Sequence, residues 1–232
     1  TLFFNIIIYS QVYVKSTAVG ANNGNSWIDA YTDVQTAIND ASIGGEDVWI
    51  AAGTYQHGSQ MGLRNGVTVY GGFPNTGNPI FGDRNYAANI TILSGNNSYR
   101  VIYNNGGGID ATAVVDGCTI QDGRVAGQGA GIYLRNCSPS FRNCIISNNN
   151  STGTAGDGAG IYMQNICISS FTNCTIENNT AQDNAGGIQT TYIGCDPTFV
   201  NCTINNNHSG DHGGGIYIYQ SSPVFDNCNI TN

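Results

Sequence analysis

The sequence of 232 residues has little charge and almost no lysine. Only 9% of its residues are charged, Lys15 is the only lysine, and the formal net charge is −8. Nucleic-acid-binding surfaces and polybasic membrane-binding surfaces both need a basic footprint. The composition therefore argues against both and predicts no nucleic-acid partner.

The sequence also lacks a long apolar run. No segment reaches the roughly 20 apolar residues that a membrane-spanning helix requires, so no transmembrane span is expected. The short apolar start, TLFFNIIIYSQ, is typical of the end of a secretory signal peptide. A first β-strand would have the same pattern. We interpret residues 1–11 as a signal-peptide remnant, which implies a secreted or cell-surface protein.

Glycine and asparagine are abundant, with 32 Gly and 31 Asn, and the sequence repeats itself. Phenylalanines recur at intervals of 30, 28 and 26 residues, and cysteines follow each of them three positions later. The first column is Phe141, Phe171, Phe199 and Phe225, and the second is Cys118, Cys144, Cys174, Cys202 and Cys228. Short apolar alternation bounded by Gly, Asn and Pro predicts strands. Units this small bury an apolar face only by stacking, so the repeat predicts a parallel β-helix solenoid.

Asparagine precedes four of these cysteines, at a bend between two strands. Coils about 4.8 Å apart would let the amides of Asn143, Asn173, Asn201 and Asn227 form a buried hydrogen-bonded ladder. A second cysteine column is Cys137, Cys167 and Cys195. Both columns have an odd number of members, which favours buried thiols over complete disulfide pairing. No Cys-x-x-Cys spacing supports zinc.

One helix is expected near the start, in TDVQTAINDASIGG. Thr32 or Asp33 can cap it, an apolar face follows at Val34, Ala37, Ile38 and Ala41, and Gly44 ends it. A short amphipathic helix of this kind can cover the open apolar end of a solenoid.

The same segments resemble a known family. DVQTAINDA followed by GGEDVWIAAGTY is similar to the cap and first coil of pectate-lyase-like right-handed β-helix proteins. GVTVYGGF, VVDGCTIQDG and SPSFRNC resemble exported β-helix repeats of Bacteroidetes-type bacteria, and the Gly-Gly-Ile and Phe-x-Asn pieces resemble polymorphic outer-membrane proteins and autotransporter adhesins. The resemblance implies an all-β, right-handed parallel β-helix over residues 12–232, associated with the outer membrane. Because the chain ends inside a repeat, we expect this single domain to be truncated at its C-terminal end.

An outward column after each Gly-Ile pair is the candidate ligand-binding face. Its residues, with their neighbours two positions on, are Tyr133, Arg135, Tyr162, Gln164, Gln189, Tyr217 and Tyr219. In enzymes that the chain resembles, the outer face of the corresponding sheet often carries the sugar-binding groove. Tyrosines with amide and guanidinium neighbours can bind sugar rings. Alternatively, these aromatic residues only pair across neighbouring strands.

Acidic residues before the Gly-Gly turns form the second candidate site. Stacking would align Asp157, Asp183 and Asp211 along one edge, where carboxylates could bind calcium. Ordinary turn capping by Asp is the alternative, and no other cofactor is expected.

No catalytic residue stands out in the sequence. Neither paired carboxylates nor a nucleophile motif is present, and His57 stands alone. We therefore predict a non-catalytic exported or cell-surface β-helix that presents a face for adhesion or for binding polysaccharide or host glycan. The alternatives are a polysaccharide lyase or glycoside hydrolase acting on acidic plant or algal polysaccharide, and a purely structural spacer.

Overall fold

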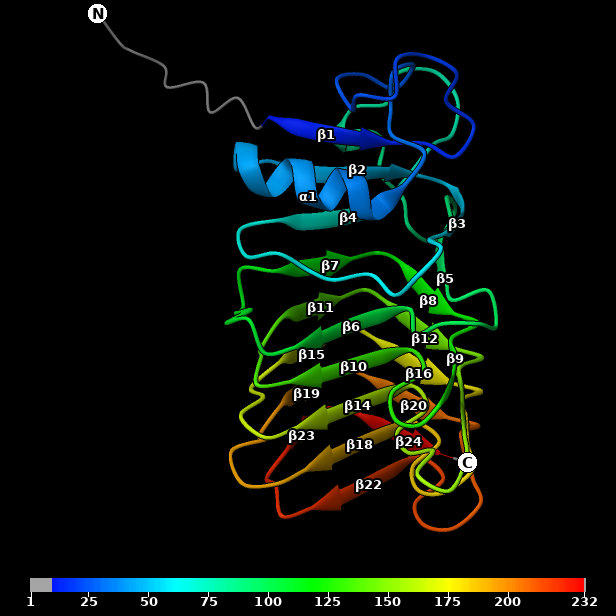
Figure 1. The fold of residues 1–232 in the computed structure, drawn as a ribbon, viewed down its shortest axis with the longest axis vertical. Helices are drawn as coiled ribbons and strands as arrows, with labels where there is room; N and C mark the ends of the chain where they lie inside the picture. The colour runs from blue at the N-terminus through cyan, green and yellow to red at the C-terminus, as the bar shows by residue number, and fades with distance from the viewer. Residues whose placement is uncertain (1–9, 232) are drawn as a thin grey trace, which may run out of the picture.

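The computed structural model describes residues 10–231, which wind into a parallel β-solenoid (Figure 1). Four sheets run along its axis, and every strand pairs in parallel with strands of neighbouring coils. The prediction of an all-β parallel β-helix is confirmed.

The strands form sheets A to D. Sheet A contains β1 Gln11–Val14, β2 Asp47–Ala51, β4 Thr68–Phe73, β7 Val114–Asp116, β11 Ser140–Arg142, β15 Ser170–Thr172, β19 Thr198–Val200 and β23 Val224–Asp226. Sheet B contains β3 Gly53–Gln56, β5 Thr91–Ser94, β8 Thr119–Gln121, β12 Ile145–Ser147, β16 Thr175–Glu177, β20 Thr203–Asn205 and β24 Asn229–Thr231. Sheet C contains β6 Ile102–Asn105, β10 Ile132–Arg135, β14 Ile161–Gln164, β18 Ile188–Thr191 and β22 Ile216–Tyr219. Sheet D contains β9 Arg124–Ala126, β13 Asn150–Thr152, β17 Thr180–Ala181 and β21 His208–Ser209.

Like side chains lie over like, as the repeat requires. Phe141, Phe171, Phe199 and Phe225 are in register on sheet A, and their successive ring centroids are 4.9, 4.8 and 4.9 Å apart. All eight cysteines are free thiols, and seven of them are buried. The phenylalanines and thiols belong to one apolar core that runs through the coils.

The helix α1, Val34–Gly44, lies against β1 and β2 at the N-terminal end of the solenoid (Figure 1). Its predicted face is buried, and Asp33 accepts a hydrogen bond from the Thr36 N–H at 2.7 Å. Gly45 follows in the left-handed conformation with φ 70°. The predicted capping helix is therefore confirmed.

The asparagine ladder exists, but its predicted burial was wrong. Asn143, Asn173, Asn201 and Asn227 all have left-handed backbones, and their amides bond along the stack at 3.2, 3.3 and 2.6 Å. The side chains of the last three are exposed, because the bend projects them outward from the coil. The ladder starts on a carboxylate, since the Asn143 amide donates to Asp116 Oδ1 at 3.0 Å.

A second ladder of asparagines, which the sequence did not predict, is buried inside the solenoid. Asn149, Asn179 and Asn207 are 1%, 0% and 3% exposed. The Asn149 amide donates to Asn179 Oδ1 at 2.9 Å, and the Asn179 amide donates to Asn207 Oδ1 at 3.0 Å. Each amide also donates to a backbone carbonyl of the preceding coil. These bonds satisfy polar groups that would otherwise be buried without partners.

Candidate functional site

An aromatic row lies on the outer face of sheet A near the N-terminal end. Tyr13 is in register with Trp49, and Trp49 with Tyr70, on three neighbouring strands. Side chains two positions apart along a strand share a face, so Gln11 and Asp47 form a polar row beside the aromatic one. The two rows together offer apolar ring faces and hydrogen-bonding groups on one surface.

A loop brings one further ring over this row. Phe81 begins the short helix η1, Phe81–Asp83, and lies 5.5 Å from Trp49 and 5.2 Å from Tyr70 between ring centroids. The Trp27 indole holds the loop by donating to the Pro79 carbonyl at 2.9 Å. The loop is anchored again where the Asn85 N–H donates to the Gly72 carbonyl at 2.8 Å.

Glycine makes this arrangement possible. The register of sheet A shifts between β2 and β4 around Gly72, whose φ is 98°. L-residues with side chains rarely adopt this conformation. A Cβ at Gly72 would also lie 2.7 Å from the backbone of Tyr86. The bulge lets Phe73 lie on the outer face, where it stacks on Trp49 with ring centroids 4.8 Å apart.

We name the resulting cavity the aromatic hollow. It has a volume of about 430 Å³ and is lined by Gln11, Asp47, Trp49, Tyr70 and Phe81. Asp47 Oδ1 accepts a hydrogen bond from the Thr68 N–H at 3.1 Å, and the Gln11 amide donates to the Tyr13 hydroxyl at 2.5 Å. Burial, and then the Asp47 carboxylate, raise the pKa of Tyr70, which keeps its phenol neutral. The hollow therefore combines aromatic faces with fixed polar groups, as small-molecule sites do.

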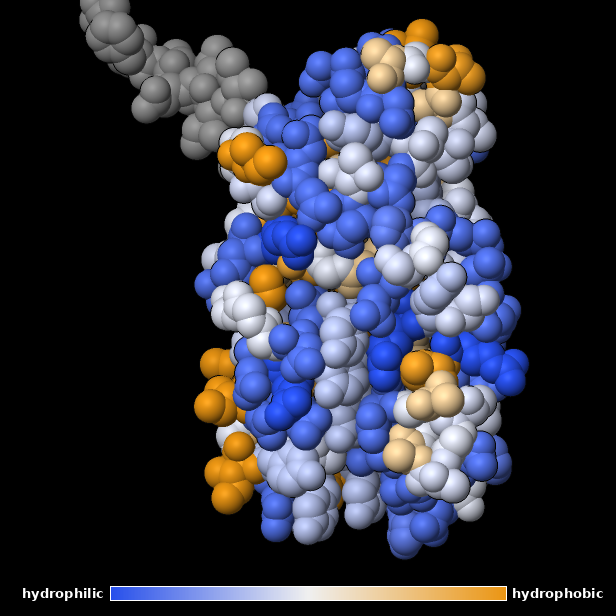
Figure 2. All heavy atoms as spheres, in the orientation of Figure 1, coloured by the Kyte–Doolittle hydropathy of each residue, from blue (hydrophilic) through white to orange (hydrophobic). Residues whose placement is uncertain are grey.

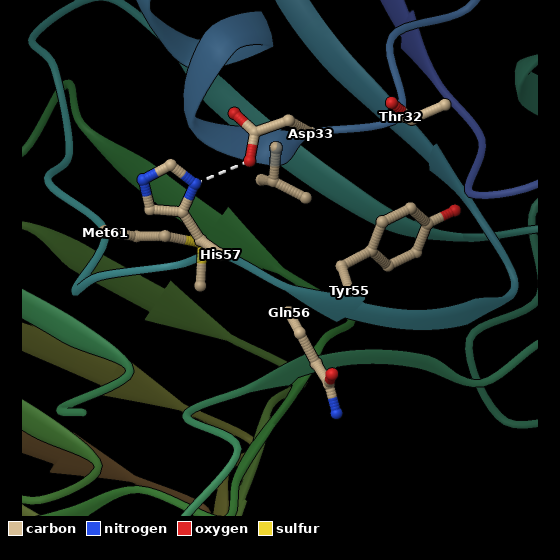
Figure 3. A pocket seen from close by; sticks show the side chains of 7 residues that line it. Thr32, Asp33, Tyr55, Gln56, His57 and Met61 are labelled. Carbon is tan, nitrogen blue, oxygen red and sulfur yellow. Dashed lines mark hydrogen bonds and ion pairs between the residues drawn. The ribbon is translucent and has the colours of Figure 1, made fainter. Parts of the chain in front are cut away.

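A second hollow lies beside the start of α1 (Figure 3). His57 Nδ1 is 2.5 Å from Asp33 Oδ2, and the Tyr55 hydroxyl points away from the imidazole. The Tyr55 hydroxyl donates to the Ala51 carbonyl at 2.8 Å, and burial raises its pKa to about 12. The space measures about 10 Å³, which is room for a single water. We assign this pair a structural role at the helix cap.

Replacing Asp33 by asparagine is expected to lower stability in a pH-dependent way. Burial opposes ionisation of Asp33, but hydrogen bonds from Thr36 and His57 outweigh it and lower its pKa. The ionised Asp33 side chain therefore stabilises the folded state above its unfolded-state pKa of about 3.9. This stabilisation is lost as the pH falls through the pKa of Asp33 in the folded state. Asparagine keeps the N-cap. Urea midpoints should differ between wild type and Asp33→Asn at pH 7, and the difference should narrow as the pH falls from 7 to 3. An equal gap at both values would contradict this.

The predicted tyrosine column lies on the outer side of sheet C, but most of it is covered. Tyr133 and Tyr162 are 8% and 6% exposed, and their rings stack with centroids 5.5 Å apart. Arg100 lies over Tyr133, and a Cβ at Gly129 would come 2.9 Å from the Cβ of Tyr133. The Gly-rich loops before each strand fold against these side chains, so little of Tyr133 and Tyr162 is accessible to a ligand.

The polar side chains of this column are also hydrogen-bonded or partly buried. Gln164 Oε1 accepts a hydrogen bond from the Tyr133 hydroxyl at 3.2 Å, and Arg135 is half-buried. Gln189 is 4% exposed. Only towards the last coil does the column open, at half-buried Tyr217 and at Tyr219, which is 47% exposed. Glycan binding by this column stays a prediction.

The three acids predicted for calcium follow one edge of the solenoid. Asp157 Oδ1 accepts hydrogen bonds from the backbone and side-chain amides of Asn184, 27 residues later on the next coil, at 3.1 and 3.2 Å, so it links two coils. Burial, and then the charges of Asp157 and Asp211, raise the pKa of Asp183. The three carboxylates therefore repel one another electrostatically. Within residues 10–231, no group of three or more His, Cys, Asp or Glu side chains is arranged to hold a metal ion. Calcium binding stays a prediction.

Stacked rings, thiols and asparagine ladders wound into parallel sheets define a β-helix protein. The chain belongs to the right-handed β-helix family, whose model, described as "Right handed beta helix region", matches residues 80–232. No curated protein and no solved structure matches the chain significantly. The resemblance to this family is confirmed, while the likeness to exported Bacteroidetes-type repeats stays a prediction. The fold in general supports a surface or carbohydrate-related role.

The part of the chain that the structure describes contains no helix long and apolar enough to cross a membrane. The prediction of no transmembrane span agrees with this finding. The predicted signal-peptide remnant, residues 1–11, falls mostly on residues 1–9, which lie outside the described residues.

Proposed function

We propose that this β-helix is a non-catalytic surface protein that binds a glycan through the aromatic hollow. One observation carries the proposal: Trp49, Tyr70 and Phe81 enclose a cavity of about 430 Å³ that is also lined by Gln11 and Asp47. Aromatic faces stack on pyranose rings, and amide and carboxylate groups bond their hydroxyls. Ligand cavities typically measure roughly 300–1,000 Å³, so the hollow can hold one or two sugar units.

Variants of the hollow provide the test. We expect Phe81→Ala and Trp49→Ala each to weaken binding of the best oligosaccharide from a glycan array at least tenfold. The first removes an exposed ring face, and the second removes the ring, 9% exposed, against which Phe81 packs. Phe81 comes from a loop and is 48% exposed, so its loss disturbs the fold less than loss of Trp49. Isothermal titration with the whole chain gives the affinities, and circular dichroism checks folding.

The matched control is Tyr219→Ala, which removes an exposed ring of the sheet C column. It should leave the affinity unchanged. If Tyr219→Ala abolishes binding while Phe81→Ala has no effect, the glycan lies on the sheet C column instead. If no glycan binds, the chain is a spacer and the proposal is wrong.

A hydrolytic role has less support around the hollow. Glycoside hydrolysis generally needs two carboxylates flanking one bond. Asp47 is one carboxylate there, but the neighbouring Asp116 is bound to Arg84 at 2.5 Å, with both side chains nearly buried. This pairing favours a binding surface over a catalytic one.

The proposal places the protein outside the cell or at its surface, in association with the outer membrane. The apolar segment that precedes β1, residues 1–10, supports export, because it has the pattern of a signal-peptide end. The face of the molecule that Figure 2 shows is mostly hydrophilic, with apolar side chains in small, separate groups, which suits contact with water. Cell fractionation of the producing organism tests the location, and recovery in the cytoplasm would contradict it.

A further inference from the structure

The aromatic hollow carries negative charge and no positive charge of its own. Its lining residues include the carboxylate of Asp47, and none of them is basic. Glu46 precedes Asp47 in the chain, and its carboxylate accepts a hydrogen bond from the Ser10 hydroxyl. The raised pKa of Tyr70, due to burial and then to Asp47, reflects the same field. A second carboxylate entering this space would meet like charge at short range.

The cationic side chain of Arg84 lies beside the hollow and is already paired with other groups. Its Nη2 lies 2.5 Å from Asp116 Oδ1, and the two side chains are 12% and 10% exposed. Its Nε donates to the Gly71 carbonyl at 2.6 Å. The guanidinium also lies over the rings of Tyr70 and Tyr86, at 5.1 and 5.4 Å from their centroids. Asp116 therefore compensates the charge of Arg84, and the Nε and Nη2 groups of Arg84 already donate to other acceptors, which weakens its attraction for an acidic ligand.

We propose, resting on the glycan-binding function above, that the hollow selects uncharged sugars and rejects uronic acids. Asp47 is the residue that distinguishes uncharged sugars from uronic acids. Its Oδ1 is held by the Thr68 N–H, and the carboxylate accepts hydroxyl hydrogen bonds from a neutral sugar but repels a ring carboxylate. Ammonium groups gain from the same carboxylate and from the aromatic faces. An amino sugar therefore binds at least as tightly as its neutral counterpart.

The experiment uses hexasaccharides in matched pairs. Gluco-, manno- and galacto-hexamers are each compared with the corresponding uronate hexamer, and a glucosamine hexamer is added, using titration calorimetry on the whole chain. We expect the uronate member to bind at least about tenfold more weakly than its neutral partner. The ratio of neutral to uronate affinity should shrink as the salt concentration rises from 20 mM to 500 mM, because screening weakens repulsion between partly exposed charges.

Asp47→Asn isolates the charge, because its amide oxygen can still accept from Thr68. This variant should raise uronate affinity about tenfold and lower neutral affinity, because an amide oxygen accepts sugar hydroxyls more weakly than a carboxylate does. Asp226→Asn is the matched control: it removes an exposed carboxylate from the last strand of the same sheet and should change neither.

The outcomes separate the two proposals. If a uronate hexamer binds as tightly as its neutral partner, or if Asp47→Asn leaves the ratio unchanged, the charge selection is wrong while glycan binding stands. If the glucosamine hexamer binds more weakly than the neutral glucose hexamer, the selection is also wrong. If no hexamer binds, the glycan-binding function fails and this inference fails with it.

Discussion

Replacing Phe171 by alanine is expected to lower the free energy of unfolding by about 3–5 kcal/mol, the range for a large aromatic side chain removed from a packed core. Phe171 is completely buried and stacks on Phe141 and Phe199 with ring centroids 4.9 and 4.8 Å away. Its removal leaves a cavity between two coils that the repeating backbone holds at fixed spacing, so the walls cannot close easily. Urea unfolding followed by circular dichroism measures the effect.

The same substitution in the last coil is the matched control. Phe225 stacks on Phe199 alone and is only partly buried. Phe225→Ala should therefore cost less than half as much as Phe171→Ala. Equal losses at the two positions would mean that contact between stacked rings contributes little and that local burial does not set the stability of a coil.

Replacing Asn179 by alanine should cost a comparable amount, about 3 kcal/mol or more. Asn179 Oδ1 accepts from the backbone N–H and the side-chain amide of Asn149 at 3.0 and 2.9 Å, and its amide donates to Asn207 Oδ1 and to the Ile146 carbonyl. Alanine leaves these buried partners unpaired, and each buried unpaired polar group costs about 1–3 kcal/mol. Urea midpoints again give the measurement.

The exposed ladder provides the comparison. Asn173 is exposed and has a left-handed backbone with φ 54°. Asn173→Gly keeps that conformation accessible, and water replaces the lost amide bonds, so the expected cost is below about 1 kcal/mol. A loss at position 173 as large as that at position 179 would show that burial does not distinguish the two ladders.

The fold could be predicted because the repeat is visible residue by residue. Phe141, Phe171 and Phe199 recur at one-coil spacing, and stacking requires like residues at like positions. The burial of the asparagines could not be predicted in the same way. Asn173 and Asn179 both lie in Asn-containing turns of one coil, and only the path of the backbone decides which of them points inward.

The candidate site was missed because it lies in the part of the chain that does not repeat. Trp49 and Tyr70 alternate with inward residues in VWIA and TVYG, which was a usable signal for an outer aromatic face. Phe81 gave no such signal, because its position depends on a loop fixed by Trp27, more than fifty residues earlier. For the tyrosine column, strand alternation correctly predicted that the side chains point outward from sheet C. It could not predict that Gly-rich loops cover most of them.

Neighbouring coils carry the same kinds of residue at matching positions, and this affects how the chain can change its length. Residues 144–173 comprise one complete turn, from the cysteine after one bend to the asparagine of the next. Joining Asn143 directly to Cys174 would delete that turn, yet each remaining phenylalanine ring, thiol and asparagine amide would meet the same kind of neighbour as before. Unequal recombination between such segments can therefore shorten or extend the molecule one turn at a time, while the aromatic hollow near its first turns is left unchanged.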